Sequence, residues 1–269
     1  MSGEIFYGIN EWLLFLLVVG ALYGCAEIGF RYGLKSANRT PPEVHSHVAT
    51  VEGALLGLLA LLLGFAFSMA MSRFEVRKEV VLEEVNDLET TYLRAHLLPE
   101  PQRQSCVTLL EEYLQSRIAY LRAATDQARI RETQETTRNL QVQLWAQAVA
   151  AARTDPNEVT TGYFIESLNG LIDDNTKRSI AMDNHVPEVI YELLLLVALL
   201  TISVTGYSSG LRGRKLRALR GILIVLIAAT LLVIMDLDRP RRGLIRVSED
   251  GMVRLESELQ EFHRGVRTP

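Results

Sequence analysis

The stretch of residues 49–97, which has an apolar half and a charged half, constrains the fold of this chain most. The apolar half, VEGALLGLLALLLGFAFSMAMS, is long enough to cross a bilayer as one helix, because about twenty residues at a 1.5 Å rise match a hydrocarbon core of roughly 30 Å. The charged half contains no proline or glycine, so nothing ends the helix at the membrane surface. We predict one helix that begins in the membrane and continues beyond it.

Three more apolar blocks predict further membrane helices, which lie at about residues 12–30, 188–207 and 219–236. The first block has no Lys or Arg ahead of it and no small-residue cleavage site behind it, so we interpret it as a retained anchor rather than a signal peptide. Residues 35–48 contain Pro41-Pro42, which predicts a loop, because proline removes a backbone donor and disfavours helical geometry before it. The expected transmembrane hairpins cover residues 1–72, with the second helix at about 50–72, and residues 187–236.

The polar middle of the chain, residues 73–186, predicts a soluble bundle of four helices that is continuous with the second and third membrane helices. Apolar residues recur at helical spacing in each segment, and strand-like alternation is absent. In the first segment they form a heptad-like seam that needs partner helices, made of Phe74, Val81, Val85, Leu88 and Tyr92. The expected fold class is all-α: four transmembrane helices, the bundle inserted between the second and third, and a tail of residues 237–269 with a short amphipathic helix.

Small residues form a stripe on one face of the second apolar block. They recur at intervals of four, three, four and four residues, and are Gly53, Gly57, Ala60, Gly64 and Ser68. Such a stripe indicates either close helix packing or a pore lined by helices around a symmetry axis. Close packing is the commoner outcome, because small residues favour it in lipid. In the first block, Gly20 and Gly24 form a second, weaker small-xxx-small pair.

Four of the acidic residues within or beside the apolar blocks are candidates for a site. Glu27 precedes Arg31 by one helical turn, which favours an interfacial ion pair over a carboxylate on an ion path. Glu52 begins the second block, either as an acid favoured by the helix dipole or as the mouth charge of a pore. Asp236 and Asp238 offer oxygen ligands to Ca²⁺, but arginines crowd the same stretch, which favours local ion pairing.

Composition and motifs argue against several classes of function. The net charge is −4 and no basic tract lies beside interleaved aromatics, so nothing indicates nucleic-acid binding. The sequence has no metal-spaced histidine cluster, no phosphate loop and no credible triad. Residues 206–210 match G-x-S-x-G, but at the end of a predicted membrane helix rather than on a strand-to-helix turn. We expect no enzymatic activity and no cofactor; the expected partners are membrane lipid and further copies of the chain, with ions if a pore forms.

Basic residues predict which side of the membrane each segment occupies. They are concentrated in the two expected short loops, at residues 31–39 and 212–220, whereas residues 1–12 have none. By the positive-inside rule, both loops are cytoplasmic, so the bundle and both termini are expected outside the cytoplasm of a multi-pass inner-membrane protein. Arg73, Arg77 and Lys78, beside the bundle, give an opposing signal.

Three segments of the sequence together resemble a known family. The segments are LLALLLGFAFSMA, EEVNDLETTYLRAHLLP and DLDRPRRGLIRVS. They are similar to the bestrophin-like integral membrane proteins of bacteria and plants, over nearly the whole chain. The resemblance implies kinship to bestrophins, which are pentameric anion channels with the second helix lining the pore. By position, it implies that one group of residues lies near a pore axis, namely Gly57, Ala60, Gly64, Phe65, Phe67 and Ser68. It also places Asp236 and Asp238 near the acidic calcium clasp of bestrophins, although the acidic cluster here is thin and rich in arginine.

Two functions follow from these patterns. The leading hypothesis is a homo-oligomeric ion channel or channel-like pore, since the stripe and the seam both require neighbouring helices. The alternative is a non-conducting membrane sensor or scaffold, in which the bundle binds a partner or ligand and the apolar helices only anchor it.

Overall fold

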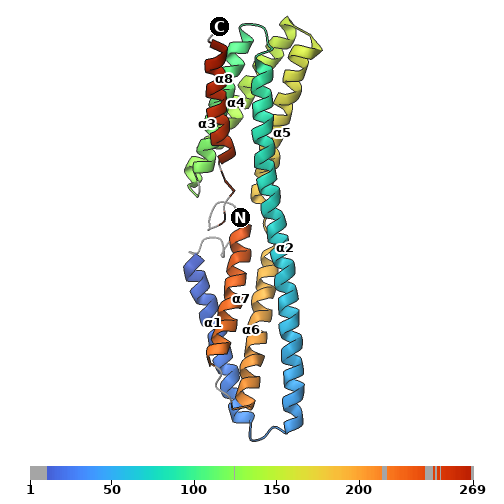
Figure 1. Ribbon diagram of the computed structural model, residues 1–269, viewed down its shortest axis with the longest axis vertical. Coiled ribbons are helices and arrows are strands. Elements are labelled where there is room, and N and C mark those ends of the chain that lie inside the picture. Colours follow the sequence, from blue (N-terminus) through green and yellow to red (C-terminus); the bar gives the residue numbers. More distant parts are fainter. Residues whose placement is uncertain are drawn as a thin grey trace. The chain divides into compact units, whose positions relative to one another are not determined.

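The computed structural model describes residues 11–123, 125–213, 217–239, 245, 247–248 and 250–267. Within these residues the regular structure is helical, with no strand, as the apolar periodicity predicted. The helices, in chain order (Figure 1), are α1 (Glu11–Ser36), α2 (Pro42–Ala95), α3 (Gln102–Arg122), α4 (Gln127–Thr154), a short π-helix η1 (Glu158–Gly162), α5 (Tyr163–Asp183), α6 (Glu188–Leu211), α7 (Arg217–Asp238) and α8 (Asp250–Arg267).

The chain divides into two compact units, and α2 passes from one into the other at Arg73. The first unit contains α1, the apolar part of α2, α6 and α7. By length and composition, four helical stretches are long and apolar enough to cross a membrane: Trp12–Ser36, Glu43–Ala95, Glu158–Leu211 and Arg217–Asp238. They contain the four apolar blocks identified in the sequence.

Helix α2 begins at Pro42, so the expected loop at residues 35–48 is shorter than predicted. Proline is tolerated in the first turn of a helix, where its missing N–H would have no intrahelical partner. The pair Pro41-Pro42 therefore ends one connection and starts the next helix, and the link between α1 and α2 spans only residues 37–41.

Helices α1 and α6 approach each other at backbone distance. A Cβ added at Gly29 would lie 2.1 Å from the carbonyl oxygen of Ser203, and one added at Gly206 would lie 2.2 Å from that of Ala26. The predicted pair makes no such contact within the described chain: an added Cβ at Gly20 or Gly24 would meet nothing within 4 Å. Small residues permit such contact but do not show which of several glycine pairs makes it.

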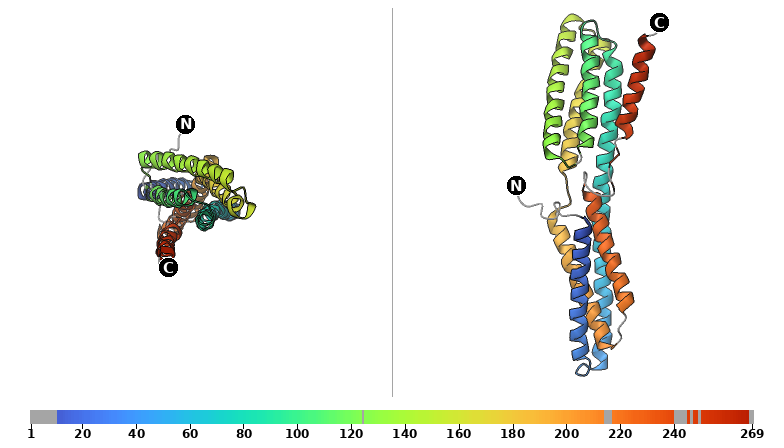
Figure 2. Two further views of the ribbon diagram at one scale, coloured as in Figure 1. Left: turned by 90° about the horizontal axis from the view of Figure 1, so that it is seen from above. Right: turned by 90° about the vertical axis from the view of Figure 1, so that its left-hand side faces the viewer.

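The second unit is a helical bundle around one apolar core. The core takes residues from the polar half of α2, from α3, α4 and α5, and from α8. The seam predicted on α2 is confirmed at Leu88 and Tyr92, which are fully buried there. Helix α8, red in Figures 1 and 2, also contributes to this core, through Met252, Leu255 and Leu259. The short amphipathic helix expected in the tail is thus part of the bundle.

Candidate functional site

The small-residue face of α2 meets no other described part of the chain. A Cβ added at Gly53, Gly57 or Gly64 would have no atom within 4 Å. Ala60 and Ser68, the other two members of the stripe, are exposed. Close packing of this stripe against helices of the same chain is therefore not observed among the described residues.

The opposite face of α2 packs inside the first unit. Leu59, Leu63, Ala66 and Ala70 are buried, at 1%, 8%, 2% and 0% exposure. These positions lie about half a helical turn away from the stripe, because each residue advances 100° around an α-helix. The helix thus presents its larger aliphatic side chains to its own unit and its small residues outward.

Aromatic residues flank the exposed stripe. Phe65 and Phe67 are 64% and 41% exposed, and at 100° per residue they lie on either side of Gly64 and Ser68. Glu52, one residue before the first glycine of the stripe, is half-buried. The arrangement is an exposed small-residue stripe flanked by two phenylalanines, with an acid at one end.

Glu27 lies in an ion-pair network rather than alone. Arg31 Nε donates to its carboxylate at 3.1 Å, which is the predicted pair within α1. Arg220 of α7, only 7% exposed, donates from Nη2 at 3.4 Å and lies over the ring of Phe30, 5.4 Å from its centroid. The sequence did not show this second partner, because it is 193 residues away.

Asp238 fixes the junction between the end of α7 and the start of α6. Both oxygens of its fully buried carboxylate accept the backbone N–H of Val186 at 3.0 Å, and Tyr191 donates its hydroxyl proton at 3.2 Å. His185 Nδ1 lies 3.0 Å from the carbonyl oxygen of Asp238. Asp238 therefore has a structural role through a backbone N–H and a tyrosine hydroxyl, whereas the local ion pairing with arginines stays a prediction. The calcium site at Asp236 and Asp238 stays a prediction, since no group of three potential His, Cys, Asp or Glu ligands occurs in the described part of the chain.

A family model, the bestrophin-like domain, matches residues 16–252. The chain belongs to the bestrophin-like family. The resemblance inferred from the three sequence segments is therefore confirmed. No curated protein sequence matches the chain.

Solved structures share the bestrophin-like fold. A bacterial bestrophin homologue from Klebsiella pneumoniae is 17% identical, with a TM-score of 0.63, covering 94% of this chain and 98% of that one. A variant of the Klebsiella homologue is 16% identical, with a TM-score of 0.65, covering 97% and 98%. A chain described as a membrane protein is 15% identical, with a TM-score of 0.65, covering 94% and 98%. At these identities the likeness shows the fold of this bestrophin-like protein and nothing more.

The bestrophin-like bundle encloses a buried charge cluster that sequence reasoning missed. Glu84 of α2 is fully buried and pairs with Arg117 of α3 and with Arg178 of α5, which are 2% and 1% exposed. The hydroxyl of Tyr113 lies 3.4 Å from the same carboxylate. The only signal in the sequence is a charge directly beside the seam residue Val85, and it does not identify the partners.

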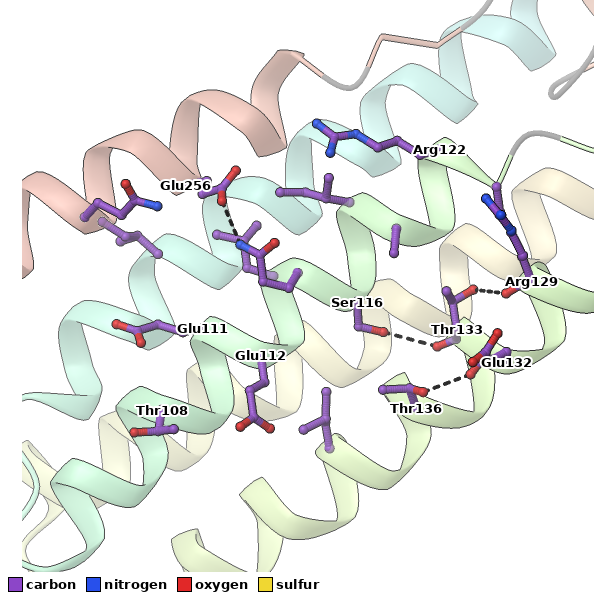
Figure 3. Close-up of a pocket in the computed structure, with 18 residues that line it drawn as sticks. Thr108, Glu111, Glu112, Ser116, Arg122, Arg129, Glu132, Thr133, Thr136 and Glu256 are labelled. Carbon is purple, nitrogen blue, oxygen red and sulfur yellow. Dashed lines mark hydrogen bonds between the residues drawn. The ribbon is translucent and has the colours of Figure 1, made fainter. Parts of the chain in front are cut away.

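The same bundle carries an open groove of about 1150 Å³ lined by α3, α4 and α8 (Figure 3). Its apolar residues are Leu114, Ile118, Leu140 and Leu259, and its charged residues are Glu111, Glu112, Glu132, Glu256, Arg122 and Arg129. Gln115 donates to Glu256 at 2.8 Å, which links α3 to α8. The groove combines an apolar lining with charges of both signs, as protein-binding surfaces do.

Proposed function

We propose that this bestrophin-like protein forms a homo-oligomeric ion channel, or channel-like pore, in which the small-residue stripe of α2 lines the path. The observation that supports this most directly is that a Cβ added at Gly53, Gly57 or Gly64 would meet no atom within 4 Å from another described part of the chain. Helices that present small residues to a symmetry axis leave a narrow passage. Phe65 and Phe67 then border its constriction, and Glu52 supplies charge at its mouth.

The proposed topology has four membrane helices, with the bundle inserted between the second and third. The apolar stretches of α1, α2, α6 and α7 span a cell inner membrane, since each is long and apolar enough. The basic residues of the α1–α2 and α6–α7 connections favour the cytoplasm for those loops. The bundle and both termini then lie outside the cytoplasm.

Ion flux into liposomes containing the purified protein tests the channel proposal. Wild-type protein is expected to conduct, and Gly57→Leu and Gly64→Leu are expected to abolish most of the flux, because each leucine fills the passage. The control is Gly24→Leu on α1, where an added side chain also meets nothing within 4 Å; it is expected to conduct as wild type does. Absence of flux of any ion, or wild-type flux in both α2 variants, would refute the proposal.

Particle images of the detergent-solubilised protein test the assembly. A closed ring with rotational symmetry is expected, because identical subunits that share one pore surround one axis. A monomeric particle would contradict the pore, since a single chain leaves the stripe without facing copies.

The groove in the bundle supports a second function, a non-conducting sensor or scaffold. Its volume of about 1150 Å³ and mixed lining suit a bound segment of another protein. Crosslinking that recovers one stoichiometric partner, together with full tolerance of Gly57→Leu and Gly64→Leu, would favour this function over the channel.

A further inference from the structure

A polar cavity of about 360 Å³ lies inside the bundle, between α3, α4 and α5. Arg117, Arg138, Gln141, Arg178 and Asp183 contribute to its wall. Its size falls within the roughly 300–1,000 Å³ typical of small-molecule sites. It shares no residue with the groove of Figure 3, so the bundle has two separate concave surfaces.

Arg178 uses only part of its guanidinium group. Its Nη1 donates to Glu84, and the side chain is 1% exposed. Its Nε and Nη2 are also buried, yet neither has a hydrogen-bond partner among the described residues. These two N–H groups form the side edge of the guanidinium fork, whose spacing matches the two oxygens of a carboxylate or a phosphate. Native proteins rarely leave such buried donors unmet.

The other polar groups of the cavity also favour a ligand that accepts hydrogen bonds. Gln141 Nε2 is buried and makes no hydrogen bond of standard geometry among the described residues, although the Gln141 side chain lies near the hydroxyl of Tyr113. Each unmet side-chain atom found among the lining residues is thus a donor. The cluster has three guanidinium groups, of Arg117, Arg138 and Arg178, against the carboxylates of Glu84 and Asp183. Unmet donors together with excess positive charge favour an anion with at least two acceptor oxygens.

Tyr120 holds the two buried arginines in place. The guanidinium carbons of Arg117 and Arg178 lie 4.9 and 5.1 Å from the centroid of its ring. With Glu84 on one side and the aromatic face on another, the free edge of Arg178 has a fixed orientation before any ligand arrives. Such preorganisation lowers the entropic cost of binding.

We propose that this cavity binds a small oxyanion, phosphate-like or carboxylate-bearing, through the Nε and Nη2 edge of Arg178, with Gln141 Nε2 and Arg138 as further contacts. The bound anion joins α3, α4 and α5, and it stabilises the folded bundle by mass action. The site does not depend on the proposed conduction through α2, because its residues all belong to the bundle unit.

Thermal unfolding of the full-length protein in detergent tests the proposal. Sodium phosphate, sodium sulfate and sodium succinate are titrated separately against sodium chloride at equal ionic strength. A saturable rise in Tm with at least one oxyanion, and none with chloride, is expected. The phosphate and succinate arms show which source of the oxyanion group the cavity prefers. An equal rise in all salts, or no rise in any, would overturn the site.

Variants of the wall connect the effect to the cavity. Arg138→Gln and Gln141→Leu leave the pairing of Glu84 intact, and each is expected to weaken the apparent Kd about tenfold or more by removing one polar contact. Arg178→Lys removes the side edge and is expected to abolish the response. Arg131→Gln, at an exposed position of α4 outside the cavity, is the control. Wild-type responses in both Arg138→Gln and Gln141→Leu would refute the assignment even if Arg178→Lys fails to fold.

Discussion

Glu84 is ionised because of the two arginines packed against it. Burial alone raises the pKa of a carboxyl group, but the guanidinium groups of Arg117 and Arg178 outweigh this effect, and the pKa of Glu84 lies below its usual value. A pKa that is lower in the folded state contributes stability above the unfolded pKa, and this stability is lost as the pH falls through the folded pKa. The bundle is therefore expected to be acid-sensitive through this residue.

Replacing Glu84 with glutamine keeps the shape of the side chain and removes its charge. The variant leaves Arg117 and Arg178 as buried charges without their carboxylate, which is expected to cost about 3–5 kcal/mol in the free energy of unfolding at pH 7. The loss is expected to shrink at acid pH, where wild-type Glu84 becomes protonated. Chemical unfolding in detergent measures both effects. Glu89→Gln, at an exposed position of α2, is the control and is expected to change stability little.

Asp87 behaves in the opposite way, because it faces another carboxylate. Burial and the neighbouring Asp174 raise the pKa of Asp87. A raised folded-state pKa contributes stability below the unfolded pKa that is lost as the pH rises through the folded pKa. Asp87→Asn is therefore expected to raise Tm at neutral pH, and the gain is expected to fade as the pH falls toward the ordinary aspartate pKa. An unchanged Tm at pH 7 would contradict this; Asp173→Asn, exposed on α5, is the comparison.

At the scale of elements, the backbone contact between α1 and α6 permits a test with single methyl groups. Gly206→Ala places a Cβ 2.2 Å from the carbonyl oxygen of Ala26, so the helices must separate, and a loss of about 1–3 kcal/mol is expected. Gly20→Ala adds the same group where nothing lies within 4 Å and is expected to be neutral or slightly stabilising. Thermal unfolding in detergent compares the two. Equal effects of both substitutions would show that the contact is not a determinant of stability.

Individual helices could be predicted from the sequence, whereas their partners could not. Apolar length identified the four membrane-length blocks, and heptad-like spacing identified Leu88 and Tyr92 as core residues. Spacing does not encode which distant surface an apolar face meets, so α8 was expected to be a separate tail although Leu255 is buried in the bundle core. Helix starts also shifted: α2 begins at Pro42, inside the stretch that was expected to be a loop.

For the candidate sites too, features within one helix could be predicted from the sequence, whereas features that join several helices could not. The stripe of α2 was visible because its members share one helix. The Arg178 cavity was not, since it joins residues from α3, α4 and α5, and Gln141 and Arg178 are each ordinary surface-type residues in the sequence. Buried polar clusters of this kind depend on tertiary contacts, and sequence periodicity does not identify tertiary contacts.

At the scale of the whole molecule, the distribution of basic residues predicts orientation. A reporter fused after Pro269, or inserted near Pro156, is expected to give an extracytoplasmic signal, because the α1–α2 and α6–α7 connections carry the excess of Arg and Lys and are therefore expected in the cytoplasm. A reporter placed in the α1–α2 connection is the control and is expected to give the reverse signal. Cytoplasmic signals at both of the first two positions would invert the topology while leaving the helix assignments intact.

The close contact between α1 and α6 also has a consequence for biosynthesis. About 150 residues separate the end of α1 at Ser36 from the start of α6 at Glu188. At a translation rate of about 5–20 residues per second, α1 emerges roughly 8 to 30 s before the helix that covers Gly29. Until then α6 is not present to cover the glycine surface of α1. A nascent chain arrested before α6 is complete should therefore be the form of this protein most exposed to quality-control proteases.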